Sequence, residues 1–169
     1  QVEAMKNAKG VILEIAEEFR TLSGREYGFF KEYYLRDAEI AILVLGSAGG
    51  TIQAVVDKLR ADGIKAGLLK LRVLRPFPFQ ELIESLKNLK VLAVLDRSDS
   101  FGAMGGPVFN ELRSALLELK DPPKAINFIY GLGGRDLGLE DVKRVYQELQ
   151  KIASNSNITK LVDYLTVRE

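Results

Sequence analysis

Four loops rich in glycine or proline carry the charged and hydroxyl side chains with which this sequence could do chemistry. Each loop follows an apolar run and precedes a helical pattern, and the four ranges are 46–51, 72–78, 96–107 and 131–136. The carboxyl ends of parallel strands meet at one edge of a sheet, where ligands and partners bind. We therefore expect one functional edge, with these candidate interface or anion-binding residues: Gly46, Ser47, Gly50, Thr51, Arg75, Asp96, Arg97, Phe101, Gly131, Gly133, Arg135 and Asp136.

The loop at 46–51 could hold an anion. Its glycines permit a close approach of the backbone, and the start of the following helix offers unpaired N–H groups with a partial positive charge. The loop lacks the lysine of a phosphate-binding P-loop and does not match the GxGxxG dinucleotide fingerprint. The structural alternative is a glycine-rich turn that Ser47 or Thr51 caps.

The other loops each have a binding interpretation and a structural one. Arg75 lies in a loop stiffened by prolines and could clamp a phosphate or carboxylate, although pairing with a carboxylate inside the chain or across an interface is favoured. Asp96 could act as a base or cap the next turn. Phe101 is an apolar residue in a polar loop and suggests docking. Arg135 and Asp136 could form an ion-paired loop or meet a partner.

Composition excludes several classes of function. The sequence has no Cys and no His, which removes thiol nucleophiles, disulfides, iron–sulfur ligation and the usual zinc sites. Any general base would have to be a shifted Asp, Glu, Lys or Tyr. A net charge of +1 argues against a nucleic-acid or polybasic membrane binder. No apolar run approaches a membrane span and no signal peptide is present, so we expect a cytoplasmic protein, cut from a longer parent because it begins with Gln1.

Hydrophobic periodicity predicts the elements that position these loops. Apolar residues from Met5 to Leu22 recur at helical spacing, and an aromatic connector without clear period follows at 25–34. Apolar runs then alternate with helical patterns. The predicted strands are 38–45, 64–71, 90–95 and 125–130, and the predicted helices lie near 52–59, 79–86, 107–119 and 139–152. A short final helix at 158–165 is expected, with a strand as the alternative.

This alternation predicts an α/β fold, a parallel sheet covered by helices on both faces. We divide the chain into a helical linker arm, residues 1–37, and an α/β domain, residues 38–169.

Taken together, the four loops resemble the alpha subunit of pyruvate:ferredoxin oxidoreductase (pyruvate synthase) over roughly residues 38–152. The resemblance is to the C-terminal part of that subunit, which is similar to the C-terminal domain of transketolase and implies a three-layer fold. The motifs that carry it are Gly46-Ser47 with Gly50-Thr51, Leu74-Arg75-Pro76-Phe77-Pro78, Leu95-Asp96-Arg97 with Ser100-Phe101-Gly102 and Gly106-Pro107, and Asn127-Phe128-Ile129-Tyr130 with Gly131-Leu132-Gly133-Gly134-Arg135-Asp136.

The resemblance implies a cytoplasmic multisubunit enzyme that oxidatively decarboxylates a 2-oxoacid to acyl-CoA and passes electrons to ferredoxin. Thiamine diphosphate, iron–sulfur clusters and coenzyme A are implied for the whole complex and none of them for this fragment. The resemblance assigns no catalytic, cofactor or metal residue here, so it implies a role in assembly with other domains and subunits, with no nucleic acid or membrane partner. The fragment alone should be inactive. The 96–102 stretch favours pyruvate over 2-oxoglutarate and leaves branched-chain 2-oxoacids open.

Two rival functions use the same loops. The chain could be a stand-alone ligand-binding domain that holds an anion at 46–51. It could instead be a small enzyme with Asp96 or Asp136 as base and Arg75 as anion clamp, which the absence of His and Cys makes the least favoured.

Overall fold

The computed structural model describes residues 1–167 and contains one six-stranded sheet in the order β1-β3-β2-β4-β5-β6. Strands β2 to β6 pair in parallel, and β1 pairs antiparallel with β3 at one edge. The bounds of the strands are β1 Phe30–Tyr33, β2 Ile40–Leu45, β3 Ala66–Leu71, β4 Val91–Asp96, β5 Lys124–Ile129 and β6 Val162–Tyr164. The central strands β2 and β4 are buried almost throughout, as expected for apolar runs without alternation.

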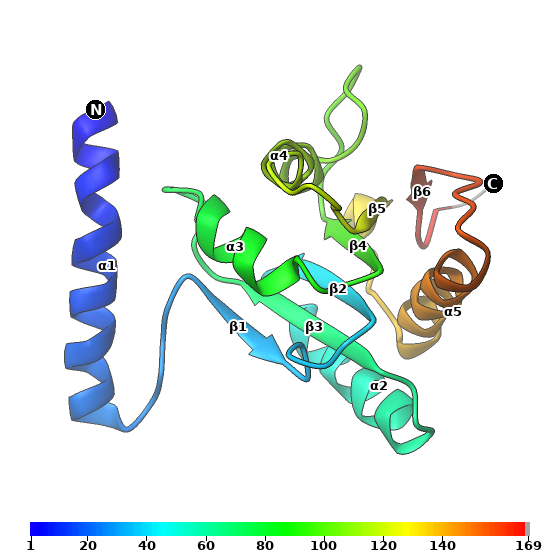
Figure 1. Ribbon diagram of the computed structural model, residues 1–169, viewed down its shortest axis with the longest axis horizontal. Coiled ribbons are helices and arrows are strands. Elements are labelled where there is room, and N and C mark those ends of the chain that lie inside the picture. The colour runs from blue at the N-terminus through cyan, green and yellow to red at the C-terminus, as the bar shows by residue number, and fades with distance from the viewer. Residues whose placement is uncertain (168–169) are drawn as a thin grey trace.

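Helices cover both faces of the sheet, which confirms the predicted three layers (Figure 1). Helices α2 (Gly49–Ala61) and α5 (Leu139–Asn155) pack on one face, and α3 (Phe79–Leu86) and α4 (Pro107–Leu116) pack on the other. Successive side chains of a strand point to opposite faces. In β2, Ile42 accordingly belongs to the core under α2 and α5, whereas Leu43 belongs to the core under α3 and α4. Each face is therefore closed by helices of this chain.

The chain reverses its direction across the sheet between β2 and β4. From β2 it passes through α2 to β3 on one side, and from β3 it passes through α3 to β4 on the other side of β2. The helices that follow β2 and β4 then leave toward opposite faces. Such a topological switch point leaves a crevice between the two strand ends.

Helix α1 (Val2–Ser23) stands beside the three layers (Figure 1). It is followed by Gly24, whose left-handed conformation lets its N–H donate to the carbonyl of Arg20. None of its residues is buried. Lys9 anchors it through an ion pair with Glu81 of α3, at 3.0 Å, and lies over the ring of Phe79. Among residues 1–167, no helix combines the length and apolarity that crossing a membrane requires.

Two segments differ from the expected elements. The final helix expected at 158–165 is wrong and its alternative is correct, because Val162–Tyr164 forms β6 on β5. This pairing satisfies the outer edge of β5, since the N–H of Asn127 donates to the Leu161 carbonyl at 2.9 Å. The aromatic connector contains β1, which covers the edge of β3. The division between residues 37 and 38 stays a prediction, and residues 168–169 of the expected domain lie outside the described residues.

Candidate functional site

Asp96, expected to be either a base or a cap, caps helix α4. Its side chain is 3% exposed; Oδ1 accepts the N–H of Val108 at 3.0 Å and Oδ2 accepts the N–H of Phe109 at 3.1 Å. These donors belong to the first turn of α4, where helical backbone groups need partners. The carboxylate at the end of β4 thus fixes the start of the following helix.

Asn127 completes this network and was not singled out from the sequence as a structural residue. It is buried, and its Nδ2 donates to the Val94 carbonyl at 2.8 Å and to Asp96 Oδ2 at 3.1 Å. Its Oδ1 accepts the N–H of Gly106 at 2.8 Å. A polar residue inside the apolar run of β5 was the available signal, because a buried amide must find partners.

The network predicts a pH dependence of stability. Burial raises the pKa of Asp96 above its ordinary value of 3.8, although the three hydrogen bonds from Val108, Phe109 and Asn127 lower it in part. The folded chain then binds more protons than the unfolded chain between the two pKa values. The contribution of Asp96 to stability is therefore largest below pH 3.8 and falls as pH rises through the folded pKa.

Asn imitates the protonated side chain, so Asp96→Asn should remove this slope. We expect the free energy of unfolding of the variant, minus that of the wild type, to rise with pH from about 3.8. Urea unfolding of both chains across a pH series measures the difference. If this difference in unfolding free energy falls with pH, the hydrogen bonds lower the pKa of Asp96 by more than burial raises it.

A second feature is the strand-end cleft, a hollow of about 330 Å³ at the carboxyl ends of the strands. It lies at the switch point and joins the loops after β2, β4 and β5. Its lining residues are Ser47, Ala48, Thr51, Arg97, Tyr130, Arg135, Asp136 and Leu137. Loops that are far apart in the sequence therefore meet here, as expected for one functional edge.

The charged groups of the strand-end cleft are not ion-paired within residues 1–167. Arg97, Arg135 and Asp136 each lack an ion pair there, so the expectation of an ion-paired loop is wrong. The guanidinium of Arg135 instead donates to the carbonyl of Thr166, because β6 brings that carbonyl beside the loop. Two cationic side chains are thus left to face the cleft.

Tyr130 is a further lining residue that sequence reasoning missed as a site residue. The residue is 5% exposed and lines the cleft, and its hydroxyl has no hydrogen-bond partner in residues 1–167. Burial raises the pKa of the phenol, against the opposing effect of Arg97. The hydroxyl is therefore a neutral donor near pH 7.

The start of α2 corrects another expectation. Ala48 occupies the N-cap position, and no side chain caps the helix, so capping by Ser47 or Thr51 is wrong. Ala48 adopts helical angles, and the chain enters the helix without the extended residue that side-chain caps use. Of the loop glycines, Gly46 has a φ of 96°, which glycine adopts most readily, whereas Gly49 and Gly50 belong to α2.

The remaining candidates lie outside the cleft lining. Arg75 pairs inside the chain with Glu111, its Nη1 lying 2.8 Å from Oε2, in line with the favoured expectation. Phe101 is 97% exposed, on the loop that extends beyond α4 in Figure 1. Gly50 lies in the first turn of α2, and Gly131 and Gly133 have φ values of 70° and 68°.

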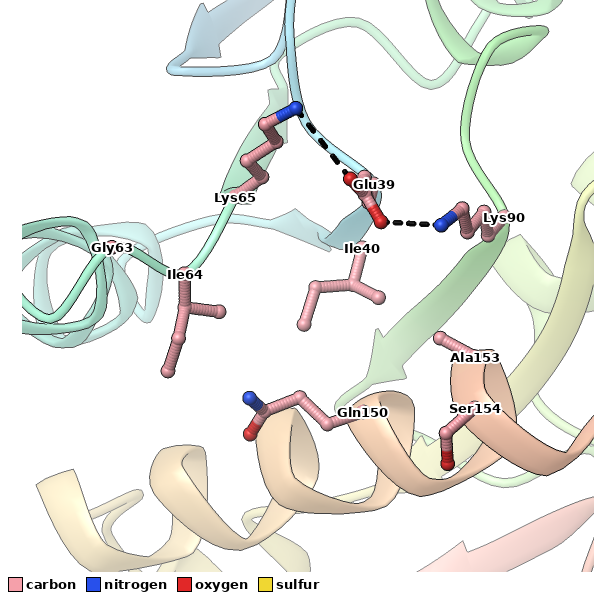
Figure 2. A pocket seen from close by; sticks show the side chains of 9 residues that line it. All are labelled: Glu39, Ile40, Gly63, Ile64, Lys65, Lys90, Gln150, Ala153 and Ser154. Atoms are coloured by element: carbon pink, nitrogen blue, oxygen red, sulfur yellow. Dashed lines mark hydrogen bonds and ion pairs between the residues drawn. The ribbon is translucent and has the colours of Figure 1, made fainter.

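A larger hollow, of about 440 Å³, lies at the amino ends of the strands, opposite the strand-end cleft (Figure 2). Its charged groups form one network, in which Glu39 pairs with Lys65 at 3.6 Å and with Lys90 at 2.5 Å. Ile40, Ile64 and Ala153 contribute apolar surface. In residues 1–167 there is no group of three or more His, Cys, Asp or Glu side chains arranged to hold a metal ion.

Comparison with known proteins identifies the family. The family model "Pyruvate:ferredoxin oxidoreductase core domain II" matches residues 38–142. The chain belongs to this family. The matched region spans β2 to the start of α5 and thus includes the strand-end cleft and the Asp96 network. The resemblance seen in the four loops is therefore confirmed.

Curated relatives extend over the whole chain. It is 43% identical over 170 residues to pyruvate synthase subunit PorA of Thermotoga maritima, covering 100% of this chain and 42% of that protein. It is 38% identical to PorA of Methanosarcina barkeri, covering 99% and 42%, and 37% identical to ketoisovalerate oxidoreductase subunit VorA of Pyrococcus horikoshii, covering 96% and 41%. The chain thus spans about two fifths of these relatives.

A solved structure supports the fold. The 2-oxoglutarate:ferredoxin oxidoreductase of Magnetococcus marinus, solved with 2-oxoglutarate, coenzyme A and succinyl-CoA bound, matches with a TM-score of 0.54 and 20% identity. The match covers 78% of this chain and 21% of that one.

Proposed function

We propose that this chain is the C-terminal domain of the alpha subunit of a 2-oxoacid:ferredoxin oxidoreductase. The complete cytoplasmic enzyme would oxidatively decarboxylate pyruvate to acetyl-CoA and transfer the electrons to ferredoxin. Family membership supports the reaction class. Identity of 43% to a pyruvate synthase subunit, against 37% to a ketoisovalerate oxidoreductase subunit, favours pyruvate as the substrate.

The domain's own role is assembly. Iron–sulfur clusters need cysteine thiolates, and this sequence has no Cys, so it cannot ligate the clusters of the complex. Asp96, the best-placed carboxylate for a base, is buried and committed to the α4 cap. We infer that the thiamine diphosphate, cluster and coenzyme A sites lie in the rest of the complex, and that this domain packs against it.

The observation that carries the assembly role is the apolar face of α1. We define this face by four residues of the helix: Val11, Ile15, Phe19 and Leu22. Their exposed fractions are 50%, 58%, 43% and 86%, respectively. Their spacing places them on one side of the helix. Ile15 and Phe19 also border an open apolar hollow of about 370 Å³ against Val73. A contiguous apolar surface of this kind marks an interaction site.

Charging this face should disrupt assembly. In the complete enzyme, we expect Ile15→Glu with Leu22→Glu to weaken association by roughly 100-fold, because burial of two large aliphatic side chains contributes about 3 kcal/mol or more. Glutamate is a good helix former, so α1 should persist. Gel filtration and thermal unfolding of the complex measure the effect.

A matched control adds the same charge to the polar side of α1. Gly10→Glu with Thr21→Glu changes two exposed residues away from the apolar face and should assemble as the wild type does. If the Ile15 and Leu22 variant elutes and melts like the wild type, the α1 face is not an interface and the assembly role loses its support.

A further inference from the structure

The strand-end cleft has features that an assembly role does not use. It lies at the switch point between β2 and β4, where α2 and α4 leave toward opposite faces of the sheet. In open α/β sheets this crevice is the usual place for a ligand. Its volume of about 330 Å³ is at the small end of the range for ligand sites.

Three different donors converge on the cleft. Helix α2 starts there without a side-chain cap, so its first turn presents N–H groups and the positive end of the helix dipole. Arg97 and Arg135 come from two other loops. Neither forms an ion pair within residues 1–167, and Arg135 has further N–H groups besides the one that donates to the Thr166 carbonyl. Guanidinium groups bind phosphate and carboxylate oxygens in bidentate fashion. All these donors favour an oxyanion.

Tyr130 adds a further donor to the cleft. The residue is 5% exposed and lines the cleft, and its hydroxyl makes no hydrogen bond within the described chain and remains accessible to solvent. Packing therefore holds the ring in place, while the hydroxyl is available to a ligand. A fixed hydroxyl at the mouth of a cationic cleft is therefore a preorganised donor, as a ligand would need.

Asp136 restricts the kind of anion. Its carboxylate lines the same cleft and would repel a bare anion, but it would accept a hydrogen bond from a ligand hydroxyl. A ligand that carries both an oxyanion and a hydroxyl group satisfies all of these residues. We propose that the strand-end cleft binds a small hydroxylated molecule through a phosphate or carboxylate group, held by Arg97, Arg135, Tyr130 and the start of α2.

Titration calorimetry tests this proposal with the 169-residue chain, whose sheet is covered on both faces by its own helices. The probes are inorganic phosphate, glycerol 3-phosphate and glycerate, at constant ionic strength. We expect glycerol 3-phosphate or glycerate to bind more tightly than inorganic phosphate, and the stronger of the two identifies the oxyanion. Absence of binding by every probe at millimolar concentration would overturn the proposal.

Variants locate the site. Arg97→Gln should weaken binding at least about tenfold, whereas Arg36→Gln, which removes an exposed arginine outside the cleft, should not change it. Tyr130→Phe keeps the buried ring and should weaken binding about fivefold. Equal affinities of the Arg97 and Arg36 variants would place the ligand elsewhere and refute the assignment.

Two further experiments test whether the ligand needs a hydroxyl group and whether a small molecule, and not a partner's side chain, occupies the cleft. Asp136→Asn should raise the affinity for inorganic phosphate and reduce the preference for glycerol 3-phosphate; an unchanged preference would contradict the hydroxyl requirement. The same titration with the complete enzyme should give the same affinity. Binding to the chain but not to the assembled enzyme would mean that a partner's side chain fills the cleft, which would overturn a small-molecule ligand.

Discussion

Replacing Gly106 with alanine is expected to destabilise the chain by about 3 kcal/mol or more. A Cβ at position 106 would lie 2.4 Å from Cβ, Cγ and Oδ2 of Asp96, which is far inside van der Waals contact. Asp96 cannot move aside without releasing the N–H groups of Val108 and Phe109. The variant must therefore either overpack the site or leave buried donors without partners. The midpoint and slope of urea unfolding give the loss.

Gly10→Ala is the matched control for this substitution. Gly10 lies in α1 and a Cβ there would meet nothing within 4 Å, so the change should be neutral or stabilise by up to about 1 kcal/mol. If Gly106→Ala also stays within about 0.5 kcal/mol of the wild type, the network around Asp96 does not constrain the start of α4.

Removal of the Tyr146 side chain should cost about 4 kcal/mol. Tyr146 belongs to α5 and is fully buried, and its hydroxyl donates to the carbonyl of Gly67 in β3 at 2.8 Å. Tyr146→Ala would leave a large cavity between the helix and the sheet and would remove this hydrogen bond. Thermal or urea unfolding of the 169-residue chain measures the loss.

Tyr146→Phe separates packing from hydrogen bonding. It keeps the ring and should cost only about 1–2 kcal/mol, because one buried carbonyl loses a donor. Equal losses for the alanine and phenylalanine variants would show that the hydrogen bond dominates. A loss below about 1 kcal/mol for Tyr146→Ala would mean that α5 does not hold the sheet.

The central elements could be predicted because their local patterns and their tertiary environments agree. The run predicted at 90–95 forms β4 at Val91–Asp96, and the run predicted at 125–130 forms β5 at Lys124–Ile129. Strands buried on both faces consist of continuous apolar residues, which a sequence displays directly. The sequence also predicts that Ser47 and Arg97 lie at one site, because parallel strands end at the same edge of the sheet, and both residues line the strand-end cleft.

The edge strands and the polar network could not be predicted in the same way. Strands β1 and β6 are short. They form because β3 and β5 offer unpaired backbone groups at their outer edges, and the hydrophobic patterns of β1 and β6 contribute less. The hydrogen bond between the side chains of Asp96 and Asn127 joins residues that are 31 positions apart, so no local sequence pattern predicts it. The apolar pattern predicts Tyr130 only as the last residue of a strand, and the fold reveals that it lines the same cleft as the loops after β2 and β4.

The most direct test of the assembly role is the turnover of the assembled enzyme that carries Ile15→Glu with Leu22→Glu. The assembled fraction is isolated at high protein concentration, and pyruvate-dependent, coenzyme A-dependent reduction of ferredoxin is measured per complex. We predict less complex but an unchanged turnover per complex, because the α1 face contributes to association and not to chemistry. Normal assembly with lost turnover would contradict this account and would place the domain in the reaction itself.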